Sequence, residues 1–152
     1  MGDLDIKTIA IFGDLDKENI KQARKSFLFE IEKLINNGAR KFYFSNYGLF
    51  YAMAMSVCYE LKPKYHIEIT QVLCSHKEVK RTQKLVDALF SGVKCTTWTK
   101  SLSLLSPLIQ NLEKMIDLSD EIVVFLGGEK SLYTETAINY AKRIHKNVIK
   151  LF

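Results

Sequence analysis

Short apolar runs alternate with longer amphipathic segments from one end of this chain to the other. Residues 6–12 (IKTIAIF) and 121–126 (EIVVFL) are almost continuously apolar, which is typical of strands buried on both faces of a parallel sheet. Between residues 17 and 36, apolar side chains recur at three- and four-residue spacing, and this period predicts a helix. Strict alternation of the two kinds of segment favours right-handed crossovers, because each helix must return over the sheet before the next parallel strand begins.

The whole pattern predicts six strands and five helices in a single domain, residues 1–152. Ser75 and Glu78 form a capping box, Ser106-Pro107 supplies an N-cap and a first-turn proline, and Asn37-Gly38 ends the first helix. We therefore expect an α/β fold, a Rossmann-like three-layer sandwich whose mostly parallel sheet has about six strands, with helices on both faces. The predicted strands are 6–12, 41–44, 66–73, 93–98, 121–126 and 147–152, and the predicted helices are 17–36, 49–61 (stopping near Pro63), 75–90, 106–117 and 133–145.

The composition, 47% hydrophobic and 26% charged, is ordinary for a soluble globular protein. No apolar run reaches the roughly 18–20 residues that cross a membrane, and the N-terminus is acidic where a signal peptide is basic. We therefore expect a cytoplasmic protein with no membrane partner. The net charge of +5 suits an anionic ligand, but the basic residues are spread over several amphipathic segments, so nucleic acid is not expected as the main partner.

The three cysteines, Cys58, Cys74 and Cys95, are widely separated and include no CxxC pair. We expect small buried hydrophobic residues rather than a disulfide framework or a zinc site. Cys74 and Cys95 could pair only if their strands are adjacent in the sheet.

Three strand-to-helix turns are candidates for a binding site, because the ligand crevice of an open parallel sheet lies beyond the carboxyl ends of its strands. They follow the first, second and fifth strands. Each leads into a helix whose first N–H groups and positive dipole end favour an anion. The predicted ligand-binding residues are Gly13, Asp14, Ser45, Asn46, Tyr47, Gly48, Gly127, Gly128, Ser131 and Thr134, with Tyr47 or Tyr51 placed to stack on a base.

Each turn also has a purely structural explanation. Gly13 permits a tight turn with Asp14 or Asp16 as the N-cap of the next helix. Asn46 tolerates left-handed backbone angles, and Ser131 can cap the last helix. The turns are therefore consistent with a crevice the size of an anion or a ribose, and they are also explained as structural connections.

No catalytic constellation is present. The chain has no HExxH, GxSxG, GxGxxG or Walker motif. Glu135 and Asp14 are weak candidates for a catalytic carboxylate, and Glu135 is equally well explained as a first-turn glutamate that the helix dipole favours. No cofactor and no metal are expected.

Two segments carry a family resemblance. Residues 35–73 contain a strand, a Tyr47-Gly48-x-Phe50 turn and a helix ending in Leu-Lys, and residues 114–152 contain Met-Ile-Asp, Ser-Asp and a late Thr134. These features resemble the SLOG superfamily, Rossmann-like domains named after the Smf/DprA and Lonely-guy (LOG) proteins, and within it the small YpsA-like bacterial proteins. The two segments cover about half of the chain, and Gly13 matches the glycine of the family's first turn.

Several signature positions depart from the family pattern. Ser45-Asn46 replace paired glycines, Tyr51 replaces an acidic residue, and Leu132-Tyr133 replace the glycines before Thr134. Paired glycines let the backbone approach a phosphate or a ribose, so their loss is expected to narrow the crevice and reduce contact with an anion. The related deoxyribosyltransferases carry a catalytic glutamate where this chain has Ala137.

The resemblance implies a cytoplasmic homo-oligomer (a dimer) that binds a nucleotide or a nucleotide derivative with little or no catalysis. An enzyme alternative is a nucleoside-monophosphate N-glycosidase (phosphoribohydrolase) of the LOG type, acting through Glu135 or Asp14. A third interpretation is a degenerate protein-interaction module.

Overall fold

The computed structural model describes residues 6–45 and 48–152. Its strands are β1 (Lys7–Leu15), β2 (Ala39–Phe44), β3 (Glu68–Val72), β4 (Lys94–Thr96), β5 (Glu121–Gly127) and β6 (Asn147–Leu151). Its α-helices are α1 (Ile20–Asn36), α2 (Leu49–Tyr65), α3 (His76–Leu89), α4 (Pro107–Leu118) and α5 (Leu132–Arg143), and a short 3-10 turn, η1 (Lys17–Asn19), precedes α1.

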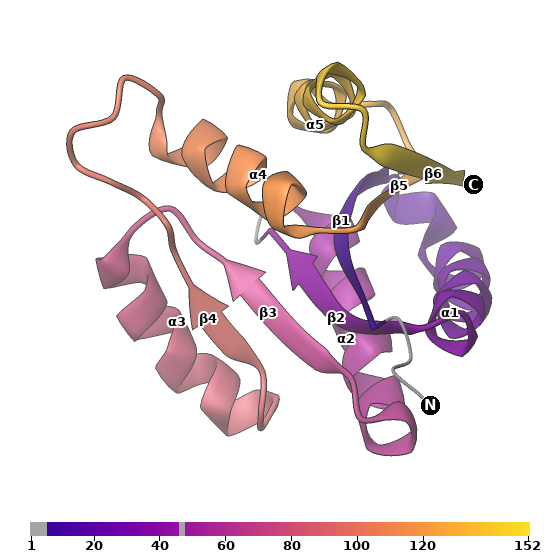
Figure 1. Ribbon diagram of the computed structural model, residues 1–152. Helices are drawn as coiled ribbons and strands as arrows, with labels where there is room; N and C mark the ends of the chain where they lie inside the picture. The colour runs from indigo at the N-terminus through magenta and orange to yellow at the C-terminus, as the bar shows by residue number, and fades with distance from the viewer. Residues whose placement is uncertain (1–5, 46–47) are drawn as a thin grey trace.

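The strands form one six-stranded sheet in the order β4-β3-β2-β1-β5-β6, and every neighbouring pair is parallel. The chain moves in one direction from β1 to β4, and α4 then carries it back to β5 beside β1 (Figure 1). The topological switch point therefore lies between β1 and β5. Because β2 flanks β1 on its other side, the three predicted turns follow three adjacent strands.

Helices cover both faces of the sheet, so the predicted three-layer α/β architecture is confirmed. On one face, α1 and α2 bury their apolar sides against the sheet, joined by Val86 of α3. On the other face, α4 and α5 pack over β1 and β5 through Leu112, Met115 and Ile138 (Figure 1). The first face holds a group of phenylalanine rings, in which Phe50 and Phe125 stack with their centroids 5.6 Å apart.

Two strands are longer at their carboxyl ends than the sequence predicts. β1 continues to Leu15 and β5 to Gly127, so Gly13, Asp14 and Gly127 belong to strands rather than to turns. The two extensions support each other, because Gly13 pairs with Phe125 and Leu15 with Gly127 in the parallel register. The sequence does not predict these extensions because each contains a glycine, a residue that is usually rare in strands.

Helix α2 passes the proline that was expected to end it. It runs to Tyr65 with Pro63 in its last turn, and it ends where His66 adopts a left-handed conformation (φ 54°). A proline removes one helical hydrogen bond. The loss is tolerated here because the preceding turn is anchored in the core by Val57, Cys58 and Leu61, which are all buried.

The three predicted serine caps are present, whereas neither Asp14 nor Asp16 caps the helix after β1, because α1 begins after Asn19 without a side-chain cap bond. The hydroxyl oxygens of Ser75, Ser106 and Ser131 accept hydrogen bonds from the N–H groups three residues onward, at 3.1, 3.3 and 3.2 Å. The capping box differs in one detail, because Glu78 accepts the N–H of Cys74 (3.1 Å) rather than that of Ser75. Gly38, with φ 108°, follows the end of α1 as predicted.

The remaining global expectations concern cysteines, metals and membranes. All three cysteines are free thiols, although β3 and β4 are adjacent. Among residues 6–45 and 48–152, no group of histidine, cysteine and acidic side chains is arranged to hold a metal ion. No helix in these ranges is both long and apolar enough to cross a membrane.

Candidate functional site

A small cavity lies at the switch point, where the carboxyl end of β1 meets the start of α2 and the turn after β5. Its volume is about 150 Å³. Ligand pockets for drug-sized molecules usually measure about 300–1,000 Å³, so this space suits a fragment the size of a pentose rather than a whole nucleotide. The lining residues are Gly13, Asp14, Leu15, Asp16, Gly48, Leu49, Phe50 and Glu129.

The glycines at this edge are packed against the protein itself. A Cβ on Gly13 would lie 2.7 Å from the carbonyl oxygen of Phe125 and 2.9 Å from the ring of Phe50. A Cβ on Gly128 would lie 2.7 Å from a carboxylate oxygen of Asp16, and one on Gly127 would overlap the Phe125 ring. At these three positions a side chain would clash with neighbouring protein atoms. Close packing within the protein therefore explains why these residues are glycines, and no ligand is needed to explain them.

Gly48 is different, because a Cβ there would meet no atom of the described residues, 6–45 and 48–152, within 4 Å. Its backbone angles, φ 102° and ψ 175°, lie in a region that essentially only glycine adopts. Gly48 is the N-cap of α2 and provides no side chain to cap that helix. The start of α2 at the cavity is therefore open on the side of Gly48.

Asp14 occupies the place that a bound anion would take at the start of α5. Its carboxylate accepts a hydrogen bond from the backbone N–H of Ser131, the N-cap of α5, at 2.9 Å. The Ser131 hydroxyl in turn accepts the N–H of Thr134, and Thr134 is fully buried. Ser131 and Thr134 are thus engaged in starting the helix, as the structural explanation of this turn proposed.

Two tyrosines fill the space between α2 and α5. Tyr51 is 4% exposed, and its hydroxyl accepts a hydrogen bond of 3.4 Å from the N–H of Gly13. Tyr133 packs its ring 6.4 Å from that of Tyr51 and 5.8 Å from that of Phe12. The burial of Tyr51 contradicts the expectation that its ring stacks on a base.

Burial sets the protonation of both phenols. It raises the pKa of Tyr51 well above its usual range, and the neighbouring Tyr133 and Asp14 add to the rise while the Gly13 N–H opposes it. Burial also raises the pKa of Tyr133 to about 12. Both tyrosines are therefore neutral hydrogen-bonding groups at physiological pH.

The other predicted residues of the second turn lie at or beside the same edge. Ser45 is 2% exposed just after β2, beside Tyr133. Asn46 and Tyr47, which were predicted to contact the ligand, lie outside the described residues.

The two candidate catalytic carboxylates have different surroundings. Glu135 is exposed in the first turn of α5 and is not among the residues that line the cavity. Asp14 lines the cavity, but its carboxylate is bonded to the Ser131 N–H. This arrangement does not form the flanking pair of carboxylates that a glycosidase uses.

Sequence reasoning missed Tyr133 and Glu129 as parts of this region. Glu129 directly follows Gly127-Gly128 and lines the cavity together with Asp14 and Asp16. A carboxylate directly after the paired glycines of the last turn was the available signal. The sequence marks Tyr133 only as a replacement for a glycine of the family pattern, because its contacts depend on how α2 and α5 pack.

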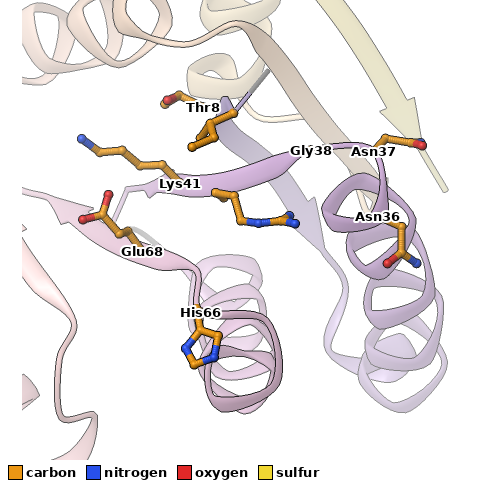
Figure 2. A pocket seen from close by; sticks show the side chains of 9 residues that line it. Thr8, Asn36, Asn37, Gly38, Lys41, His66 and Glu68 are labelled. Carbon is orange, nitrogen blue, oxygen red and sulfur yellow. The ribbon is translucent and has the colours of Figure 1, made fainter. Parts of the chain in front are cut away.

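A larger cavity, of about 640 Å³, lies at the opposite, amino end of the strands. Figure 2 shows Thr8, Lys41 and Glu68 on neighbouring strands, with Asn36, Asn37 and His66 at the ends of α1 and α2. Two of its charged groups have partners within the protein, and the Lys41 ammonium lies over the ring of Tyr43. Arg40 donates to the carbonyl oxygens of Ile35 and Ala39 at the end of α1, and Glu68 lies 3.7 Å from Lys94.

Size alone therefore does not decide between the two cavities. Ligands of open parallel sheets bind beyond the carboxyl ends of the strands, at the topological switch point. Cavities of about 410 and 340 Å³ also lie at the carboxyl ends of β4 and β5, but the smallest of these cavities is the one lined by the end of β1 and the start of α2. We therefore assign the candidate site to this smallest cavity. No known protein family's sequence profile matches this chain, and no curated protein is significantly similar to it.

Proposed function

We propose that this chain is a SLOG-like Rossmannoid domain that binds a nucleoside monophosphate or a related nucleotide derivative at the carboxyl ends of β2, β1 and β5, without strong catalysis. The observation that carries the proposal is the cavity at the β1–β5 switch point, lined by Gly13, Asp14, Asp16, Gly48 and Glu129. The position is the one at which folds of this class bind nucleotides.

The acidic lining supports a ribose rather than a phosphate inside the cavity. Asp14, Asp16 and Glu129 contribute three carboxylates, which accept hydrogen bonds and repel an anion. An acidic side chain that accepts the ribose hydroxyl groups is a recurring feature of dinucleotide-binding sheets. The volume of about 150 Å³ is consistent with a group of that size.

The start of α2 supports a place for the phosphate outside this acidic cavity. Leu49 and Phe50 begin the helix at the cavity wall, and the N-cap Gly48 offers no side-chain acceptor for their N–H groups. A helix of 17 residues has a full positive dipole end there. The start of α5 is less suitable, because Asp14 already occupies the N–H of Ser131.

The surroundings of the two candidate catalytic carboxylates, Asp14 and Glu135, support weak or absent catalysis. Glycoside cleavage needs an acid and a nucleophile or base on opposite sides of the sugar. Asp14 is held by a backbone N–H, and Glu135 does not line the cavity. We therefore propose a binding or sensing domain rather than a glycosidase.

A thermal-shift panel of nucleosides, nucleoside monophosphates and ADP-ribose tests the proposal. Glu129→Gln is the site variant, because it removes one lining carboxylate from an exposed position where no fold defect is expected. Glu18→Gln is the matched control, since Glu18 is exposed in the nearby η1 turn and does not line the cavity. We expect a nucleoside monophosphate to stabilise the wild type and Glu18→Gln, and to stabilise Glu129→Gln less.

Two other outcomes would replace the proposal. Release of free base from a nucleoside monophosphate, lost in Glu135→Gln, would support the LOG-type hydrolase. Equal melting temperatures with and without every ligand at millimolar concentration would support the interaction module.

A further inference from the structure

The outer face of α3 carries a row of cations without acidic partners. Lys77, Lys80, Arg81 and Lys84 are all exposed, and their positions in α3 place them on one face of the helix. Within residues 6–45 and 48–152, none of the four forms an ion pair. The acidic residues of α3 are used elsewhere, since Glu78 accepts the Cys74 N–H and Asp87 accepts from Gln83.

Leucine side chains project from the same helix and from the loop between β4 and α4. Leu85 and Leu89 are each 61% exposed near the end of α3. In the loop, Leu102 and Leu104 are 98% and 106% exposed, which means that neither contacts the rest of the protein to any extent. Leu102 and Leu104 therefore make no contribution to the core of this chain.

Hydrogen bonds to α4 hold the two ends of the loop that carries Leu102 and Leu104. The side chain of Gln110 in α4 accepts from the N–H of Lys100 at 2.8 Å and donates to the carbonyl oxygen of Leu105 at 2.9 Å. The buried Asn111 accepts the N–H of Trp98 at 2.7 Å and donates to Thr99. These bonds hold both ends of the loop on α4 and leave its tip in solvent.

The helix face and the loop lie on one side of the molecule. Both flank β4, the edge strand of the sheet, and the Thr99 hydroxyl donates to the carbonyl oxygen of Cys74 just before α3, at 2.6 Å. Figure 1 shows α3 and the loop along the same margin, away from α1, α5 and β6. We call the four cations of α3 together with Leu102 and Leu104 the β4-side surface.

We propose that the β4-side surface docks this protein reversibly on an anionic lipid bilayer. The leucines of the loop insert among the acyl chains, and the cations of α3 contact the acidic headgroups. Such contact is peripheral and requires no spanning helix. It is independent of the ligand site, which lies at β2, β1 and β5.

The chemistry of the surface favours a bilayer over other partners. A second copy would bring two rows of like charge together. The phosphate backbone of a nucleic acid would pair with the cations but leave the leucines against a polar surface. A protruding loop tip needs a fitted pocket on a protein partner, whereas a lipid interface accepts apolar side chains of any arrangement.

Flotation of the full chain with vesicles tests the proposal. We expect binding to phosphatidylcholine vesicles that contain about one-third phosphatidylserine, little binding to pure phosphatidylcholine, and loss of binding as salt is raised to about 0.5 M. Lys80→Gln/Arg81→Gln is expected to weaken the partition coefficient about thirtyfold, given the usual contribution of each basic residue near an anionic membrane. Leu102→Ser/Leu104→Ser is expected to weaken it at least as much.

Matched controls distinguish an effect of the β4-side surface from a general effect of removing positive charge or an exposed leucine. Lys21→Gln/Lys25→Gln removes the same charge from exposed positions on α1, and Leu132→Ser removes a leucine that is 69% exposed on α5. Both controls are expected to bind like the wild type, and all variants to melt like it. Equal weakening by the α1 and α3 pairs, or no binding of the wild type to the anionic vesicles, would overturn the proposal and point to an acidic protein partner.

Discussion

Tyr133 shows how a single side chain can take the place of a ligand at the edge of a sheet. Its ring lies between Phe12 and Tyr51 at the edge of the sheet. The side chain is partly buried, and this burial raises the pKa of the phenol to about 12. Its hydroxyl must therefore stay protonated for the packing to persist.

This burial predicts a loss of stability at high pH. The folded-state pKa of about 12 exceeds the usual value of 10.0, so the unfolded chain loses this proton first. The contribution of Tyr133 is complete below pH 10 and declines between pH 10 and pH 12. In urea denaturation across that window, Tyr133→Phe should have a lower free energy of unfolding at neutral pH but a smaller decline. An equal decline in both proteins would contradict the assignment.

Gly13 provides a second prediction for a single residue. Gly13→Ala places a methyl group against the Phe125 carbonyl and the Phe50 ring, both of which are buried. We expect the free energy of unfolding to fall by about 1–3 kcal/mol without any ligand present, as overpacking usually does. Unchanged stability in denaturant would instead mean that this glycine serves ligand access alone.

Among the helices, α5 illustrates how a strand residue fixes the start of a distant helix. Asp14 of β1 accepts the N–H of Ser131, which is 117 residues away in the sequence. The bond satisfies one of the free N–H groups at the helix start and places a negative charge at the positive dipole end.

Neutralising this carboxylate should weaken the attachment of α5. Asp14→Asn keeps the shape and an acceptor oxygen but removes the charge, so we expect a loss of about 1 kcal/mol in the free energy of unfolding. Asp16→Asn is the matched control, because Asp16 is exposed and makes no side-chain cap bond. Equal effects of the two substitutions on unfolding would contradict the role of Asp14.

The order of the elements could be predicted from the sequence because it depends on local signals. Apolar periodicity gives the strands and helices, and the serines at positions 75, 106 and 131 mark helix starts that the structure confirms. The end of α2 was predicted less well, since the packing of Leu61 outweighs the effect of Pro63.

The interior of the candidate site could not be predicted in the same way. The role of Gly13 depends on Phe50 and Phe125, which are distant in sequence. Whether Tyr51 faces solvent or core depends on Tyr133, at the start of another helix. Contacts of this kind arise only when the whole sheet is assembled. The sequence alone therefore does not show whether protein atoms or ligand atoms pack against a given glycine.

For the whole molecule, the sheet order places three helix starts and three carboxylates around one switch point. The expected dimer stays a prediction, and light scattering on the purified chain would test it. The β4-side surface is on a sheet edge away from the switch point, so lipid docking and ligand binding can be measured separately.

The most direct test of the account is the melting temperature of the wild type with nucleoside monophosphates at millimolar concentration. A ligand at ten times its dissociation constant stabilises a protein by about 1.4 kcal/mol, which corresponds to about 3–5 °C for a chain of this size. We predict a shift of that order for at least one nucleoside monophosphate, reduced in Glu129→Gln and retained in Glu18→Gln. No shift with any of them would contradict a nucleotide site at the β1–β5 switch point.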